Sequence, residues 1–170
     1  MKDWLAKKLT NYVEPRRGEL TDKLAPVIGD ILRYQARGET LRNFIGQTVD
    51  KTNASVILAH SLGGIASVDW LAESPHSVRA LVTVGSQAAY FYEIDALYSR
   101  KLGTGLPDSF PKKWLNIYDR RDFLGYAASR IFRGKAMDLD VDNGQPFPAS
   151  HSAYWQNDVI WGEIARILKT

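Results

Sequence analysis

Apolar residues recur at helical spacing through the first fifty residues of the chain. Five of them would share one face of a helix that ends near Gly38: Leu20, Leu24, Val27, Ile28 and Ile31. Four more repeat the pattern after a Thr40 cap: Leu41, Phe44, Ile45 and Val49. A shorter helix is predicted over residues 2–13, before Pro15. The pattern therefore predicts a helical N-terminal segment over residues 1–52.

From residue 55 onward, short apolar runs alternate with helical patterns. Four strands are predicted, at residues 55–59, 78–84, about 114–118 and about 137–141. The first run, Ser-Val-Ile-Leu-Ala, is typical of a strand buried on both faces. A helix over residues 62–73 ends at Ser74-Pro75, and a last helix carries Ile160, Ile164, Ile167 and Leu168. Residues 53–170 are thus predicted to form an α/β fold, a mainly parallel sheet with helices on both faces.

The composition predicts a single domain over residues 1–170. The chain is 45% hydrophobic, and no repeat or long linker marks a boundary within it. No stretch approaches the roughly 18 apolar residues that a membrane span needs. The opening residues also lack the apolar run of a secretory signal. We therefore expect a cytoplasmic protein with no membrane span.

Charge and cysteine content exclude several classes of site. The chain has no cysteine, and its three histidines lack the clustered spacing of a metal site. The net charge is +3, but the basic residues occur as scattered pairs that do not build one basic stripe. We therefore expect no disulfide, no metal site and no nucleic-acid partner.

The junction between the first strand and the following helix carries a candidate nucleophile. Residues 59–64 read Ala-His-Ser-Leu-Gly-Gly, with small residues two positions before and after Ser61. A sharp strand-to-helix turn forces such a serine into strained backbone geometry and exposes its hydroxyl at a helix N-terminus, so its neighbours must be small. Ala59 stands where the usual pattern has glycine. The sequence predicts that Ser61 is the nucleophile of a nucleophile elbow.

A serine hydroxyl needs a neighbouring base, and the chain offers three histidines. His60 precedes Ser61 in a strand, where consecutive side chains point to opposite faces. His76 follows a helix of about 18 Å, which places it at the opposite edge of the sheet. His151 lies in a loop of small and polar residues between the last strand and the last helix. His151 is therefore the predicted base.

The strand at about 114–118 leads into two candidate acids, Asp119 and Asp122. Asp122 clears the strand end and is followed by Phe123-Leu124, an apolar anchor that would direct its carboxylate towards the sheet. Asp119 stands beside two arginines, as in a turn or a surface ion pair. We favour Asp122 and keep Asp119 as the alternative. The chain order Ser, Asp, His then matches one of the known arrangements of serine hydrolases.

These motifs resemble those of small bacterial lipases and esterases of the α/β-hydrolase superfamily. The similar stretches are residues 56–64, 116–124 and 150–155, and with the elements between them they cover about residues 41–170. The resemblance implies hydrolysis of a small-molecule or lipid ester through an acyl-enzyme intermediate. It also implies that the Leu62 backbone N–H is one oxyanion donor and that no cofactor takes part.

The chain departs from this family before the elbow. Family members carry several strands there, and a loop after one of them supplies a second oxyanion donor, whereas residues before Ser55 are predicted to be helical. The fold is therefore expected to be reduced or truncated. Loss of one donor costs on the order of a hundred- to a thousandfold in turnover. The apolar first strand also needs a cover: the N-terminal helices, a second copy in a homo-oligomer, or a missing N-terminal partner.

Two other functions use the same features. One is an impaired or truncated hydrolase fold with a binding role, and the other is a related thioesterase, acyltransferase or peptidase. Five aromatic residues that follow the second and third strands are candidates for an apolar acyl pocket: Tyr90, Phe91, Tyr92, Phe123 and Tyr126. Packing in the core or in a loop is the alternative role of these aromatic residues.

Overall fold

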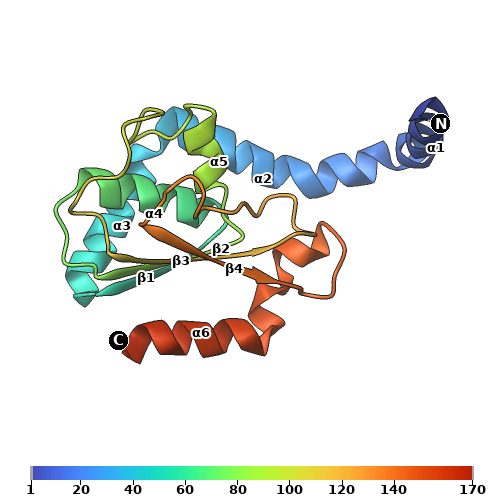
Figure 1. Ribbon diagram of the computed structural model, residues 1–170. Coiled ribbons are helices and arrows are strands. Elements are labelled where there is room, and N and C mark those ends of the chain that lie inside the picture. The colour runs from blue at the N-terminus through green and yellow to red at the C-terminus, as the bar shows by residue number, and fades with distance from the viewer. Residues whose placement is uncertain (1, 170) are drawn as a thin grey trace. The chain divides into compact units, whose positions relative to one another are not determined.

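The computed structural model describes residues 2–169, except for six side chains: those of Lys2, Arg16, Glu19, Leu20, Lys23 and Leu24. The chain divides into two compact units, Met1–Ala36 and Arg37–Thr170. The described part of the first unit is helical, and the second unit contains a sheet with its covering helices (Figure 1). The second unit also contains every residue predicted to belong to the catalytic site.

The first unit is a succession of helices, as the apolar spacing predicts. Its elements are α1 (Lys2–Val13), the 3-10 turn η1 (Glu14–Arg16) and most of α2 (Arg17–Arg37). On the predicted apolar face of α2, Val27 and Ile31 are half-buried and Ile28 is exposed. The side chains of Leu20 and Leu24, which complete that face, lie outside the described residues.

Helix α3 (Glu39–Thr52) packs against α4 (Leu62–Glu73) through a glycine contact. A Cβ atom at Gly46 would stand only 2.8 Å from Nε1 of Trp70, so glycine permits this close approach. The buried residues of α3 are Arg42, Gly46 and Val49. The predicted stripe was therefore wrong at Phe44, which is 62% exposed, because the small residue and not the aromatic one faces α4.

The second unit is built on a four-stranded, all-parallel sheet. Its strands are β1 (Val56–His60), β2 (Ala80–Val84), β3 (Lys113–Asp119) and β4 (Ala136–Val141). They lie in the order β1-β2-β3-β4, and the register aligns Ala59, Thr83, Asn116 and Asp138 across the sheet. Because the strands are parallel, the loops after their carboxyl ends meet at one edge of the sheet.

Helices cover both faces of this sheet, as the alternating pattern predicts. Helix α4 lies on one face with α3 and α5 (Ala88–Glu93), and α6 (Asp158–Lys169) lies on the other (Figure 1). Alternate residues of the strands pack with α6 in one core cluster: Ala80, Val82, Val84, Leu115, Ile117, Val141, Tyr154, Ile160, Ile164 and Ile167. The intervening residues of β2 face the opposite layer, so β2 is buried throughout.

Strand β1 does not fit the prediction of a strand buried on both faces. It lies at the edge of the sheet, where Leu58 is 41% exposed and Val56 and Ile57 are only half-buried. Its apolar composition is that of a central strand, but composition does not determine strand order. Among residues 2–169, the chain supplies β1 with one strand neighbour, β2.

Two 3-10 turns connect β4 to α6 and carry the predicted base. These turns are η2 (Ala149–His151) and η3 (Ala153–Gln156), and they follow the loop after β4 (Figure 1). The predicted nucleophile, acid and base therefore all follow carboxyl ends of strands. Within residues 2–169, no helix combines the length and the apolar character needed to cross a bilayer.

Candidate active site

Ser61 occupies a strained turn between β1 and α4. Its backbone angles are φ 53° and ψ −125°, in a region that residues with a Cβ rarely adopt. The Ser61 N–H donates to the carbonyl of Val84 at 2.9 Å, which ties the turn to β2. A Cβ at Gly64, three positions after the serine, would collide with the Ser86 side chain, whereas a Cβ at Gly63, the predicted small position, would make an ordinary contact of 3.8 Å with Ala59 Cβ. Ser61 is half-buried and keeps part of its surface open to solvent.

His151 joins Ser61 to Asp122 through its two ring nitrogens. Its Nε2 lies 2.9 Å from Ser61 Oγ, and its Nδ1 lies 2.8 Å from Asp122 Oδ2. Both His151 and Asp122 are buried. If His151 Nδ1 carries the proton and donates it to the carboxylate, Nε2 is free to accept the Ser61 hydroxyl hydrogen. The structure thus brings the three predicted residues into one hydrogen-bonded chain.

Asp119 has a different set of partners. Its carboxylate accepts the Arg121 N–H at 2.8 Å and the Asn143 N–H at 2.7 Å, so it links the end of β3 to the loop after β4. Asp119 forms the expected turn, but it is 1% exposed and not part of a surface pair. The neighbouring arginines bond other carboxylates: Arg120 pairs with Asp140, and Arg121 with Asp142.

Tyr154 contacts the predicted acid, and the sequence pattern did not predict this contact. Its hydroxyl donates to Asp122 Oδ2 at 2.8 Å and accepts the Asp119 N–H at 3.0 Å, and the residue is fully buried. Burial, followed by the nearby negative charge of Asp122, raises the pKa of the Tyr154 hydroxyl well above its ordinary value. The hydroxyl therefore remains protonated and donates to the carboxylate. A tyrosine three positions after a histidine is a weak signal by itself.

His60 contacts the turn that carries the predicted base. Its Nε2 lies 2.7 Å from the backbone carbonyl of His151, and the two imidazole centroids are 4.7 Å apart. Burial lowers the pKa of His60, an effect that its hydrogen bond to the His151 carbonyl only partly offsets. A neutral His60 with its proton on Nε2 can donate to that carbonyl. The alternation of side chains along a strand, which excludes His60 as the base, does not predict this contact.

Two glycines make room for the acid and for Tyr154. At Gly85, where φ is +56°, a Cβ would stand 2.8 Å from Tyr154 Cε2 and 3.0 Å from Asp122 Oδ2. At Gly125, a Cβ would stand 3.0 Å from the Tyr154 hydroxyl oxygen. The loops after β2 and β3 therefore depend on glycine to approach the buried carboxylate.

Helix α4 begins directly beside the serine. Leu62 is the first residue of α4, so its N–H has no carbonyl one turn earlier in the helix to bond. The amino end of a helix also carries a partial positive charge. The Leu62 N–H is thus available to an oxygen that becomes negative next to Ser61.

The aromatic residues predicted for an acyl pocket make separate contacts. Tyr90 and Tyr126 stack with ring centroids 4.8 Å apart, and Phe91, which is buried, packs edge-on against Tyr90. Phe123 is 70% exposed and stacks on Phe147 at 5.0 Å. The stacked tyrosine pair and the stacked phenylalanine pair are therefore two distinct apolar surfaces.

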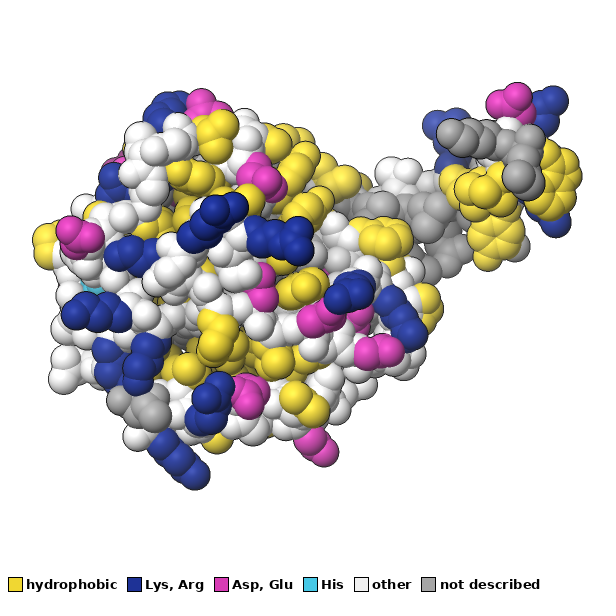
Figure 2. All heavy atoms as spheres, in the orientation of Figure 1, with side chains coloured by type: hydrophobic (Ala, Val, Ile, Leu, Met, Phe, Trp, Pro, Cys, Tyr) yellow, Lys and Arg dark blue, Asp and Glu magenta, His cyan; other side chains and the backbone are white. Residues whose placement is uncertain are grey.

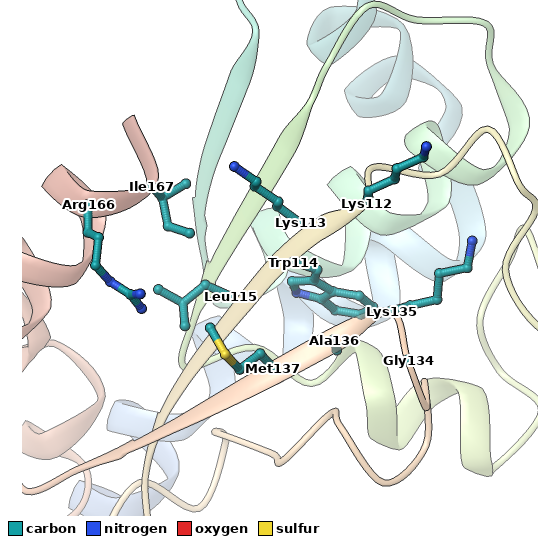
Figure 3. A pocket seen from close by; sticks show the side chains of 10 residues that line it. All are labelled: Lys112, Lys113, Trp114, Leu115, Gly134, Lys135, Ala136, Met137, Arg166 and Ile167. Atoms are coloured by element: carbon teal, nitrogen blue, oxygen red, sulfur yellow. The ribbon is translucent and has the colours of Figure 1, made fainter. Parts of the chain in front are cut away.

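A hollow at the opposite edge of the sheet has a different character. It encloses about 460 Å³ at the amino ends of β3 and β4 (Figure 3). Its lining residues are Lys112, Lys113, Trp114, Leu115, Gly134, Lys135, Ala136, Met137, Arg166 and Ile167. The predicted catalytic residues follow the carboxyl ends of the strands, so this hollow does not belong to their site.

The part of the chain that the structure covers was compared with the ligand sets of metal sites. Among those residues, no group of three or more His, Asp or Glu side chains is placed to hold a metal ion.

No protein-family model and no curated protein matches the chain.

Proposed function

We propose that this protein is a serine hydrolase of the α/β-hydrolase type that cleaves carboxylic esters through an acyl-enzyme intermediate. The proposal rests on one observation: the continuous chain from Ser61 Oγ to His151 Nε2 at 2.9 Å and from His151 Nδ1 to Asp122 Oδ2 at 2.8 Å. The strained backbone of Ser61 at the start of a helix supports the same assignment.

In the first half-reaction, Ser61 Oγ attacks the carbonyl carbon of the ester while His151 Nε2 takes the hydroxyl proton. The imidazolium that forms is held by the Asp122 carboxylate. Collapse of the tetrahedral intermediate breaks the bond to the alkoxy oxygen, and His151 returns its proton to that oxygen. An alcohol leaves, and the acyl group stays bound to Ser61 as an ester.

In the second half-reaction, water replaces the alcohol as the reacting hydroxyl group. His151 takes a proton from the water as its oxygen attacks the acyl carbon, and then returns a proton to Ser61 Oγ. A carboxylic acid is released and the serine is restored. The balance is one ester and one water consumed for one acid and one alcohol formed.

The negative oxygen of each tetrahedral intermediate needs a hydrogen-bond donor. The proposal assigns this role to the Leu62 N–H at the amino end of α4. In residues 2–169 no strand precedes β1, so no loop between earlier strands supplies a second donor. Because one donor is worth about a hundred- to a thousandfold in turnover, we expect slow hydrolysis by this chain alone.

The substrate is expected to carry an apolar acyl or alkoxy group. Phe123, next to Asp122 in the chain, stacks on Phe147 and remains largely exposed. Tyr90 is also partly exposed and stacks on Tyr126, whose N–H donates to the Ser86 carbonyl beside the elbow. Exposed aromatic surfaces of this kind favour apolar ligands.

The proposal is tested by hydrolysis of p-nitrophenyl acetate and p-nitrophenyl butyrate. We expect wild-type turnover above the buffer rate and none above it for Ser61→Ala, since alanine lacks the attacking oxygen. The matched control is Ser152→Ala, because Ser152 is exposed and bonds only a local carbonyl, that of Ala149. Equal turnover in Ser61→Ala and Ser152→Ala would contradict the proposal.

A further inference from the structure

The Tyr154 hydroxyl makes two hydrogen bonds in opposite senses at the acid of the site. It donates to Asp122 Oδ2 and accepts from the backbone N–H of Asp119. The same Oδ2 atom also receives the His151 Nδ1 hydrogen bond, while Oδ1 accepts the Leu124 N–H at 2.9 Å. Both carboxylate oxygens are therefore fixed, and Tyr154 shares one of them with the base.

A second donor on Oδ2 has two effects on the base. It fixes the carboxylate in the orientation in which Oδ2 meets His151 Nδ1. It also draws negative charge towards the tyrosine, so the carboxylate stabilises an imidazolium less strongly than it would alone. The first effect is measured by kcat and the second by the titration of the base, and both depend on a single oxygen atom of Tyr154.

We propose that Tyr154 is a positioning residue of this site, which sets both the orientation of Asp122 and the strength of its support for His151. This inference rests on the proposed function. The fit at Gly85 supports it, because any side chain there would displace the Tyr154 ring or the Asp122 carboxylate. The titratable groups around the base are Asp122, Tyr154 and His60, and only Tyr154 is altered in the test.

The test compares Tyr154→Phe with Thr83→Val. Thr83 is also fully buried, and its hydroxyl likewise makes two hydrogen bonds in opposite senses. It donates to Asn116 Oδ1 and accepts from Trp114 Nε1, both at 2.8 Å, and neither partner is one of the three catalytic candidates. For Tyr154→Phe we expect kcat to fall by about tenfold with KM unchanged, the size of effect that one lost hydrogen bond gives. The acid limb of the pH profile should move to higher pH, because the freed carboxylate holds the imidazolium more strongly. Thr83→Val should change neither.

Two readouts separate this inference from the proposed function. Hydrolysis reports on both, whereas the nuclear magnetic resonance titration of the His151 ring reports on the Tyr154 contact even in an inactive protein. An upward shift of that titration in Tyr154→Phe, absent in Thr83→Val, supports the inference whether or not the chain hydrolyses esters. If the two variants had equal titration curves of the His151 ring and equal kcat, the inference on Tyr154 would be overturned.

A separate observation concerns helix α1, which exposes an apolar face. Leu5, Leu9 and Val13 follow one another at a spacing of four residues, and they are 54%, 57% and 41% exposed. Trp4, at the border of this face, is 61% exposed and lies under the Lys8 ammonium, which is 4.6 Å from its ring centroid. Figure 2 shows hydrophobic and basic side chains gathered together on this helix.

The excess positive charge of the chain lies in the same segment. Residues 1–17 contain five of the 22 Lys and Arg residues and two of the 19 Asp and Glu residues, so they carry +3. The remaining 153 residues contain 17 basic and 17 acidic residues and have no net charge. A short stretch thus combines an apolar face with the whole net charge of the protein.

We infer that α1 docks on an anionic lipid surface, with its apolar face in the acyl boundary and its lysines at the headgroups. Basic amphipathic helices with a tryptophan at their border bind membranes in this way. A second copy of the chain is the less favourable occupant, because pairing would bring two segments of charge +3 together. The inference does not depend on hydrolysis.

The test is sedimentation of the full chain with vesicles of phosphatidylcholine alone or with about 30% phosphatidylglycerol, a content that gives a strongly negative surface. We expect binding only to the anionic vesicles. Leu9→Asp should reduce the bound fraction at least tenfold, whereas Asn11→Asp, with the same change of charge on the opposite side of α1, should reduce it far less.

Three outcomes would overturn this inference. They are equal binding to neutral vesicles, equal loss in Leu9→Asp and Asn11→Asp, and a wild-type dimer in light scattering that Leu9→Asp dissociates. The last result would assign the face of α1 to a second copy. A loss of binding to the anionic vesicles in the double variant Lys7→Gln/Lys8→Gln, which a lower salt concentration restores, would support the lipid surface.

Discussion

The two edges of the sheet hold polar side chains in opposite ways. At the carboxyl edge, Asp122 and His151 are buried and hydrogen-bonded into one chain with Ser61. At the amino edge, Lys112 and Lys113 line a hollow of about 460 Å³ but are themselves exposed, and their side chains extend away from its apolar floor (Figure 3).

This difference shows which feature identifies a site. The hollow has volume and charge, but its lysines do not fix one another in place. The carboxyl edge has groups that cost free energy to bury and that lie within hydrogen-bond distance of one another. Such an arrangement is expected where chemistry requires defined positions, so the comparison favours the carboxyl edge as the functional one.

The largest expected effect comes from removing the base. His151→Ala should lower kcat/KM for p-nitrophenyl butyrate on the order of 10⁴-fold or more, because the nucleophile and its base act as a unit. The matched change at the amino edge, Lys113→Gln, should leave kcat/KM within about twofold, since surface substitutions have small effects. A large loss in Lys113→Gln would reverse the comparison between the two edges.

The next effect distinguishes the two aspartates at the carboxyl edge. Asp122→Asn should lower kcat on the order of 10³- to 10⁴-fold, because an amide holds the wrong tautomer of the histidine. Asp119→Asn should lower kcat less than about tenfold and act mainly on stability, since its carboxylate bonds backbone N–H groups. Steady-state kinetics and thermal melting of both variants provide the measurement. The opposite ranking in kcat would make Asp119 the acid.

How far the sequence predicts this site depends on the kind of information each residue needs. Ser61 is marked by its small neighbours and by the strand and helix around it, and His151 by the exclusion of His60 and His76. These arguments use local pattern and the geometry of a parallel sheet. The structure places both residues, with Asp122, at the edge where those arguments put them.

The features that the sequence did not predict depend on tertiary contacts. Tyr154 and His60 bond a carboxylate and a carbonyl that are close to them only in the folded chain. The edge position of β1 depends on strand order, which apolar composition does not encode. The exposed Phe44 depends on Gly46, which meets the Trp70 ring of a different helix.

Substitution of His60 should have a smaller effect on turnover, together with an effect on stability that depends on pH. Because the pKa of His60 is lowered in the folded protein, the unfolded chain binds its proton first as the pH falls. The stability that neutral His60 contributes is therefore fully present above about pH 6.5 and is lost as the pH falls below that value. Thermal melting between pH 7.5 and pH 5 should show this loss, and His60→Phe should reduce the slope. The variant should also lower kcat about tenfold, the effect of one lost tether.

If His60→Phe and the wild type had the same slope of stability with pH, burial would not lower the pKa of His60. An unchanged kcat in His60→Phe would show that the contact between His60 and the His151 carbonyl does not hold the turn. A matched control is His76→Phe. His76 also bonds a backbone carbonyl, that of Leu71, but it lies outside the carboxyl edge. His76→Phe should leave the kinetics of ester hydrolysis unchanged.

The smallest expected effect on turnover comes from Asp138, which anchors the loop that follows the acid. Its carboxylate accepts hydrogen bonds from Ala128, Ser129 and Asn116. Burial raises the pKa of Asp138, but these hydrogen bonds outweigh it and the net pKa is lowered. Its contribution is therefore present above about pH 3.8 and is lost as the pH falls below that value.

Asp138→Asn should lower the free energy of unfolding by about 1 kcal/mol at pH 7, because the amide nitrogen that replaces one carboxylate oxygen cannot accept the part-buried hydrogen bonds to that oxygen. Urea unfolding measures the change, and kcat at 25 °C should fall by less than about threefold, since the catalytic groups keep their contacts. Unchanged stability would show that the loop does not depend on this carboxylate. Asp140→Asn, at an exposed position of β4, is the control.

The central claim is that the carboxyl edge activates Ser61. The most direct measurement is labelling of the folded protein with a fluorophosphonate, followed by peptide mass spectrometry. Because the reagent captures an activated serine without the need for turnover, we predict one adduct, on Ser61, and its loss in His151→Ala and in protein unfolded in urea. Absence of an adduct on Ser61 in the folded protein, or equal labelling of His151→Ala, would contradict the account.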